Sequence, residues 1–446
     1  MHCKPWLYPL LAILSMTAQA SSTQEFTLDN GLKLVVREDH RAPVAVTQVW
    51  YKVGSSYEPS GKTGMSHALE HMMFKGTEKV PAGEFSRLVA WFGGTDNAFT
   101  TDDYTAYYQV YSSNRLPLAL ELEADRMANL QMQPESFAQE IRVVMEERRQ
   151  RTDDNPQSQA LEKFQALAMF TTPHRTPTIG WMQDLENLKI EDLSAWYRQW
   201  YVPNNATLVV VGDVDPLQVK AQAEQFFGAI KPSSALPAMT VPREIPQPGR
   251  REMKLSVPAK VPALYMGFNV PSLTTAATPK DAYTLRMLLS ILDGGLSARL
   301  ESRLVREKRI LTAVSSNYNL MARGDTLFTL TAIPGEGLTM EEARDKILEE
   351  LEALKTETIT PEELERVYAG VLAENVFRQD DIQEQANLIG MLESIGLGWQ
   401  IMDTLPENLK AVTPDDIRES AKRWLVPANM TTLLLQPAAL NVGEAK

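Results

Sequence analysis

Alternating apolar and polar positions predict that the first part of the chain forms a sheet. Two such runs, together residues 26–36, flank Asn30-Gly31, a dipeptide typical of a tight β-hairpin turn. A further run at residues 44–53 predicts another strand, and the glycines at 54, 61 and 64 predict a loop after it. We therefore expect a sheet that leads through this loop into a helix.

A later segment, residues 104–111, is rich in aromatic and β-branched residues and predicts a strand. It is entered from Gly93-Gly94 and contains polar residues, so we expect it at an edge of the sheet. An exposed edge can bind an extended peptide by adding it as one more strand. Taken alone, the segment is interpreted equally well as an ordinary sheet strand.

Helical spacing of apolar residues predicts several helices. Residues 116–130 predict one, and Pro134 opens another, because proline suits the first position of a helix. In the second half of the chain, Thr339 and Thr360 are each followed three residues later by glutamate, the spacing of a capping box at a helix start. The chain thus combines sheet and helix throughout.

Residues 231–250 predict a linker. Prolines recur there at 232, 237, 242, 246 and 248 with two serines among them, a composition typical of an extended segment. The linker would separate an N-terminal domain, residues 21–230, from a C-terminal domain, residues 251–446.

An internal repeat supports this division. The sequence Glu-Asn-Leu-Lys occurs at 186–189 and again at 407–410, and a predicted helix follows it each time. A Val-Pro segment comes after each of these helices, at 202–208 and at 426–433. We therefore predict two similar α+β halves.

Composition and charge indicate the number of domains and exclude some classes of binding partner. The 446 residues are 44% hydrophobic, enough for two or more domains with large cores. The net charge of −13 and the pI of about 5.1 argue against a polyanionic partner such as nucleic acid. Beyond the N-terminus, no segment approaches the roughly 20 apolar residues that a membrane span requires, so we expect no membrane span.

The N-terminus has the pattern of a secretory signal peptide. A polar start with Lys4 precedes an apolar core at residues 6–16 and then the sequence Thr-Ala-Gln-Ala, so we predict that cleavage after Ala20 removes residues 1–20. The protein would then be periplasmic or secreted. The only cysteine, Cys3, lies in the removed segment, so the mature chain would form no disulfide.

The chemistry of the chain is carried by His67, Glu70 and His71. Two histidines four apart, with a glutamate three after the first, lie on one side of a helix and can converge on one point. Neutral imidazoles at this spacing bind a zinc ion without bending the helix, and Glu70 would be the general base toward a zinc-bound water. The alternative is an ordinary core helix in which the three residues coincide.

Two further glutamates share a helix face. Glu140 and Glu147 are seven residues apart, two helical turns. By spacing alone, such a pair is more often a surface feature than a pair of ligands. Glu146 and the arginine-rich residues 148–151 are expected to be solvated surface. His40 and His174 are expected in a surface turn and in a loop.

These segments together resemble the pitrilysin/insulinase family of inverted zincins, in particular its half-size members. The matching stretches are residues 64–77, residues 93–101 with the tyrosine-rich strand, and residues 140–147, and the resemblance extends over nearly all of the chain after residue 20. The resemblance implies α+β architecture with two homologous halves, each a mostly antiparallel sheet packed with helices.

The resemblance also implies roles for individual residues. Glu147 would be the third ligand of one zinc ion per chain, beside His67 and His71, and Glu140 would be an acid that supports the site. Asn97 and Ala98 would bind the backbone of a peptide substrate.

One departure from the family concerns an arginine that is followed seven residues later by a tyrosine, a pair that helps to hold the substrate at the zinc. This chain keeps Arg306 but has Ala313 in place of the tyrosine. We therefore expect a homologous partner subunit that carries the Arg-Tyr pair. The competing account is a homodimer in which Tyr318 or Arg306 holds the substrate carbonyl.

The leading hypothesis is a zinc endopeptidase that cleaves short, extended peptides. One rival is a non-catalytic assembly subunit, although this chain keeps all five motif residues of the zinc site. The other is a zinc-dependent peptide-binding module, in which Glu70 would be dispensable. The second half of the chain contains no histidine, so it cannot build a second site of this kind.

Overall fold

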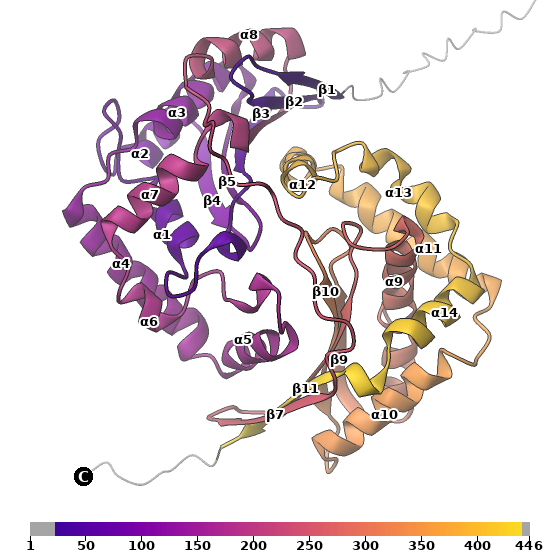
Figure 1. Cartoon of the computed structure of the whole chain (residues 1–446). Coiled ribbons are helices and arrows are strands. Elements are labelled where there is room, and N and C mark those ends of the chain that lie inside the picture. The colour runs from indigo at the N-terminus through magenta and orange to yellow at the C-terminus, as the bar shows by residue number, and fades with distance from the viewer. Residues whose placement is uncertain (1–22, 439–446) are drawn as a thin grey trace, which may run out of the picture.

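The computed structural model describes residues 23–438 and contains two halves, each with its own sheet and helices (Figure 1). The predicted signal peptide lies outside the described residues. Between the last helix of the first half and the first strand of the second, residues 228–250 contain no helix or strand. No helix within residues 23–438 is long and apolar enough to cross a membrane.

The first sheet has six strands in the order β1-β2-β6-β3-β5-β4. Only β2 and β6 run parallel, and the other neighbours are antiparallel. The Asn30-Gly31 hairpin is confirmed, since β1 and β2 pair with Phe26 opposite Leu34. The strands are β1 (Thr23–Thr27), β2 (Lys33–Glu38), β3 (Val44–Tyr51), β4 (Thr95–Thr100), β5 (Thr105–Ser112) and β6 (Ala206–Gly212).

The prediction that residues 104–111 form an edge strand is wrong. This segment is β5, which pairs with β3 on one side and β4 on the other. Its Tyr107 and Tyr111 are buried on one face, and Gln109 on that same face is fully buried and donates from its amide to Glu123. The edge is β4, which pairs only with β5 in the described structure.

The second sheet has five strands in the order β7-β11-β8-β10-β9, and only β7 and β11 run parallel. Strand for strand, this order repeats β2-β6-β3-β5-β4 of the first sheet, with β1 as the additional strand there. The Val-Pro segments of the repeat lead into β6 and β11, which occupy equivalent places. The fold class is therefore confirmed. The strands are β7 (Arg251–Val257), β8 (Ala263–Val270), β9 (Leu311–Tyr318), β10 (Thr326–Pro334) and β11 (Thr431–Pro437).

Helices of the first half cover one face of the first sheet. Both predicted helices are confirmed, as α3 and α4, and Pro134 is the first residue of α4. The helices are α1 (Met65–Met72), α2 (Phe85–Trp91), α3 (Leu116–Asn129), α4 (Pro134–Arg148), α5 (Pro156–Ala168), α6 (Met182–Leu185), α7 (Ile190–Trp200) and α8 (Pro216–Phe227). Short 3-10 helices are η1 (Ser55–Tyr57), η2 (Ser113–Arg115), η4 (Pro173–Arg175) and η5 (Pro203–Asn205), and η3 (Arg149–Asp153) is a short π-helix.

In the second half, the capping box of Thr339 and Glu342 is present, and Thr360 accepts a hydrogen bond from the backbone of Glu363. The helices are α9 (Pro279–Leu292), α10 (Met340–Ala353), α11 (Pro361–Arg378), α12 (Ile382–Ser394), α13 (Ile401–Lys410) and α14 (Pro414–Trp424). In addition, η6 (Glu301–Glu307) is a π-helix and η7 (Pro427–Asn429) is a 3-10 helix.

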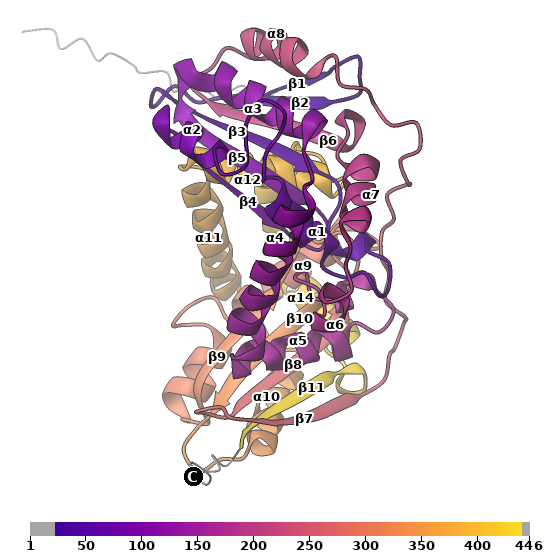
Figure 2. The same cartoon turned by 90° about the vertical axis from the view of Figure 1, so that its left-hand side faces the viewer.

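Each half contributes one helix to the sheet of the other. α12 packs on β3 and β6 of the first sheet (Figure 1). Its Gly390 lies so close to Trp50 that an added Cβ would be 2.0 Å from the indole ring. α4 runs from beside the first sheet toward α5 (Figure 2). α5 packs on β7, β8 and β11 through the buried Phe164. This exchange fixes the two halves relative to one another.

Candidate metal centre

The first turn of helix α1 is fixed by close packing at Gly64 and by hydrogen bonds to Glu58. Gly64 precedes it at a φ of +88°, and a Cβ there would be 2.7 Å from the carbonyl oxygen of Ile179. The carboxylate of Glu58 accepts hydrogen bonds from the backbone N–H groups of Gly64 and Ser66, at 2.7 and 2.6 Å, and so caps the helix. Apolar residues bury one face of α1, which leaves the face with the two histidines toward α4.

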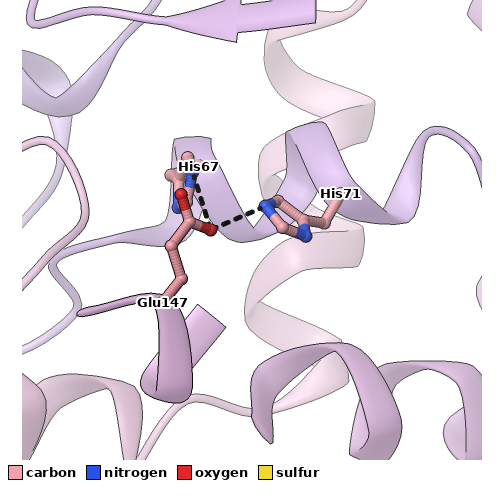
Figure 3. Close-up of side chains that lie close together, drawn as sticks. All are labelled: His67, His71 and Glu147. Atoms are coloured by element: carbon pink, nitrogen blue, oxygen red, sulfur yellow. Dashed lines mark ion pairs between the residues drawn. The ribbon is translucent and has the colours of Figure 1, made fainter. Parts of the chain in front are cut away.

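The structure brings together His67, His71 and Glu147. His67 Nε2 lies 3.8 Å and His71 Nε2 3.4 Å from Oε2 of Glu147, which α4 supplies in its last turn (Figure 3). One ligand atom from each residue lies within 4.8 Å of the other two. The three side chains are 12%, 21% and 15% exposed, so the cluster is shielded yet reachable from solvent.

The chemistry of these groups fits zinc. Burial, together with the nearby His71 and Arg151, lowers the pKa of His67 to about 3, so its imidazole is neutral and its nitrogen lone pair is free to bind a metal. Two imidazole nitrogens and one carboxylate are a donor set that zinc accepts in catalytic sites, where a fourth position stays open for water or substrate.

Glu140 lies behind the ligands. Its Oε2 is 3.4 Å from Nδ1 of His71, and its Oε1 is 2.7 Å from Nζ of Lys75. A carboxylate at Nδ1 favours the tautomer whose Nε2 lone pair is directed at the metal position. Lys75 was not identified from the sequence, because it lies beyond Met72, the last residue of α1, where helical spacing no longer applies.

Glu70 lies on the same helix face and is half-buried. Burial raises its pKa above the ordinary carboxylate value, and a hydrogen bond donated by the hydroxyl of Thr100 partly offsets this effect. Thr100 is the last residue of β4, so the bond ties the proposed base to the end of the edge strand. Nothing in the spacing of the sequence indicated this contact.

The substrate-binding residues predicted on β4 lie on the edge of the sheet beside α1. Asn97 is exposed and Ala98 is half-buried, and the side-chain oxygen of Asn97 accepts a hydrogen bond from the backbone N–H of Ala98 at 2.9 Å. The unpaired side of β4 is therefore available to an extended peptide.

The expectation of solvated surface after Glu147 is only partly right. Glu146 is exposed, as expected, and pairs with Arg149. Arg148 is instead buried and donates to the carboxylate of Glu162 and to the carbonyl oxygen of Gly180. Arg151 pairs with Oε1 of Glu147, the carboxylate oxygen other than the one that faces both histidines.

The C-terminal half places its candidates away from this cluster. Arg306 is exposed on η6 and donates to the carbonyl oxygen of Leu296, and no contact found within residues 23–438 joins it to the histidines. Ala313 is exposed on the edge strand β9. Tyr318 is buried with its hydroxyl bonded to the carbonyl oxygen of Pro271, so the suggestion that it positions a substrate is wrong for this conformation.

The other two histidines within residues 23–438 lie in different surroundings. His40 is exposed and pairs with Asp213 at 2.7 Å, as expected for a surface turn. His174 is in η4 but is buried, with Nε2 2.9 Å from Oδ1 of Asp103. The description of His174 as a loop residue missed this buried ion pair, because Asp103 lies far away in sequence.

Comparison with known proteins identifies the family of the chain. A family model described as insulinase (peptidase family M16) matches residues 33–180, and one described as the peptidase M16 inactive domain matches residues 187–371. The zinc protease PqqE of Helicobacter pylori is 32% identical over 96% of this chain and 97% of its own length.

Solved structures show the same likeness. The crystal structure of a protease from Helicobacter pylori has a TM-score of 0.87 at 30% identity and covers 94% of this chain and 100% of that chain. The periplasmic protease PqqL from Escherichia coli has a TM-score of 0.78 at 17% identity, and this chain covers 47% of it. The resemblance found in the sequence is confirmed: the relatives' names support a zinc metallopeptidase, and the chain belongs to the insulinase family of peptidases, M16.

Proposed function

We propose that the chain is the zinc-bearing subunit of an endopeptidase that hydrolyses short, extended peptides. The observation that carries the proposal is the convergence of His67, His71 and Glu147 on one point, with Glu70 on the same face of α1. Zinc held by these three residues, one ion per chain, would acidify a bound water and polarise the scissile carbonyl.

The chain's own residues would perform the remaining tasks. Glu70 accepts the proton of the attacking water and returns it to the leaving amine. Glu140 holds the His71 ring in orientation and keeps its Nε2 available for the metal. The peptide adds to β4 as a further strand, with Asn97 and Ala98 contacting its backbone, so that its scissile bond lies alongside α1.

A partner subunit would complete the site. Ala313 is exposed on β9 and has no donor side chain, while Tyr318 is buried, so nothing at these positions can hold the substrate carbonyl. A homologous subunit with an arginine and a tyrosine there would supply such a donor. The Escherichia coli neighbour is about twice as long as this chain, which is consistent with a second unit of similar size. The competing proposal is a homodimer in which Arg306 acts instead.

The signal-like N-terminus supports export, and we place the protein in the periplasm or outside the cell. The alternative function is a non-catalytic assembly or peptide-binding subunit that contains zinc without hydrolysis. In that alternative, replacing Glu70 would leave the function of the protein unchanged, whereas a peptidase would lose its activity.

Metal analysis tests the assignment of the ligands. The purified chain that begins at residue 21 should contain one zinc ion, and His71→Ala should lose it, because two protein ligands hold zinc far more weakly than three. Glu146→Gln, a change of an exposed acid next to Glu147, should retain the zinc. Undiminished zinc in His71→Ala would remove the basis of the proposal.

A further inference from the structure

A fully buried arginine of the C-terminal half inserts into the N-terminal half. Arg323, in the loop between β9 and β10, has a side chain that is 1% exposed. Its guanidinium donates to Oδ1 of Asp103 at 2.9 Å, to the hydroxyl of Ser56 and to the carbonyl oxygen of Thr240, and lies 4.3 Å from the ring centre of Tyr57. Such a charge is tolerated in the interior only because it is paired and hydrogen-bonded.

The acceptor, Asp103, is the centre of a buried cluster. Its Oδ1 also accepts from the hydroxyl of Ser56 at 3.2 Å and lies 2.9 Å from Nε2 of His174. Burial alone would raise the pKa of Asp103, but its bonds to His174 and Arg323 outweigh this effect and lower it, so the carboxylate is charged. The cluster thus joins four segments: η1, the β4–β5 turn, η4 and the C-terminal half.

The β4–β5 turn, residues 101–104, is bonded to the segment that leads to α1. Backbone N–H groups of Ser55 and Ser56 donate to the carbonyl oxygens of Thr101 and Asp102, at 3.1 and 2.8 Å. The approach is so close that a Cβ on Gly54 would be 2.2 Å from the oxygen of Thr101. The turn and the η1 segment therefore move as one block.

This block is in contact with the zinc-bearing helix at two points. Thr100, immediately before the turn, donates to the carboxylate of Glu70. Glu58, immediately after η1, caps the N-terminus of α1. Arg323 of the C-terminal half is bonded to the same block through Ser56 and Asp103.

We propose that Arg323 is a positioning residue for Glu70, by which the C-terminal half sets the orientation of the base in the N-terminal half. The proposal rests on the proposed role of Glu70. It gives the half without zinc ligands a part in the chemistry. When Arg323 is removed, the turn loses its buried anchor, the Thr100 hydroxyl is no longer held toward Glu70, and turnover falls although the metal ligands are intact.

The test uses the full mature chain with its partner subunit and compares three variants. Arg323→Met removes the guanidinium and its hydrogen bonds. Arg323→Lys keeps a positive charge but lacks the two separate guanidinium nitrogens that donate to Asp103 and Ser56. Lys33→Met is the control. Lys33 pairs with Glu393 of α12 at 2.6 Å, so its loss also breaks an ion pair between the halves but leaves the β4–β5 turn untouched.

We expect Arg323→Met to keep its zinc and its KM and to lose about 10–100-fold in kcat, the usual effect of removing a group that supports a metal site. Arg323→Lys should lose less, and Lys33→Met should keep kcat. Hydrogen exchange should quicken at residues 54–56 and 101–104 in Arg323→Met alone, a readout that does not depend on activity. Unchanged kcat, or exchange that quickens equally in the control, would overturn the proposal.

A double-mutant cycle separates positioning from general weakening. Thr100→Val removes the bond to Glu70 directly, so adding Arg323→Met should lower kcat no further, whereas additive losses would contradict the proposed route. If Arg323→Met does not fold, the same cycle with Arg323→Lys decides. A Glu70→Gln variant with full activity would refute the role of the base, whereas an inactive Glu70→Gln with a fully active Arg323→Met would refute this inference alone.

Discussion

Replacing Glu140 by glutamine tests how far the metal centre depends on the carboxylate behind His71. Glutamine keeps the shape and can still accept a hydrogen bond from Nδ1, but it carries no charge. The change leaves Nζ of Lys75, now 2.7 Å from Oε1, without its anion, and His71 becomes a weaker donor to the metal. Glu140 is 6% exposed, so water cannot readily replace the lost charge.

The expected loss follows from this geometry. The 3.4 Å separation from Nδ1 is long for a hydrogen bond, so we place the loss of zinc affinity within the usual range of about 10–100-fold, or about 1.4–2.8 kcal/mol. Competition with a chromogenic chelator measures the affinity of the purified chain. Glu146→Gln is the matched control, because Glu146 lies on the same helix but is 55% exposed. Equal affinities for both variants and the wild type would refute the assigned role of Glu140.

Three further predictions concern pH, packing and the partner. Burial would lower the pKa of His174, but its bond to Asp103 outweighs this and raises it above 6.5, so the stabilisation is complete below that pH and is lost as pH rises through the folded-state value. Thermal unfolding against pH should show this loss in the wild type and not in His174→Gln. Gly390→Val should lower the free energy of unfolding by about 1–3 kcal/mol in denaturant titration, because the new side chain meets Trp50, whereas Gly370→Val on α11 meets no atom within 4 Å of its Cβ and should avoid this packing cost. Peptidase activity should rise with added Arg-Tyr subunit and saturate at equal stoichiometry, whereas full activity of the chain alone would contradict the heterodimer.

Local patterns predicted the elements and most of the metal cluster. His67, Glu70 and His71 lie within one helical turn, so their common face follows from periodicity alone. Glu147 needed the resemblance, because a long-range contact between α1 and α4 brings it to the histidines.

What the sequence did not predict depends on pairing between distant segments. The position of β5 inside the sheet is set by β4, whose mostly polar sequence was not recognised as a strand of its own. The burial of Arg323 requires the two halves to meet, and the burial of His174 against Asp103 requires two segments of the first half that are 71 residues apart; no local pattern encodes either contact. The exchange of α5 and α12 between the halves is unpredictable for the same reason.

The most direct measurement of the central claim is peptide cleavage by Glu70→Gln, assayed beside its zinc content with the partner present. The amide keeps the shape of the side chain and its contact with Thr100 but cannot accept the proton of water. We predict a full complement of zinc and a rate of cleavage that is lower by about 10²–10⁴-fold. A variant that contains zinc and cleaves at the wild-type rate would show that Glu70 is not the base and would contradict the account.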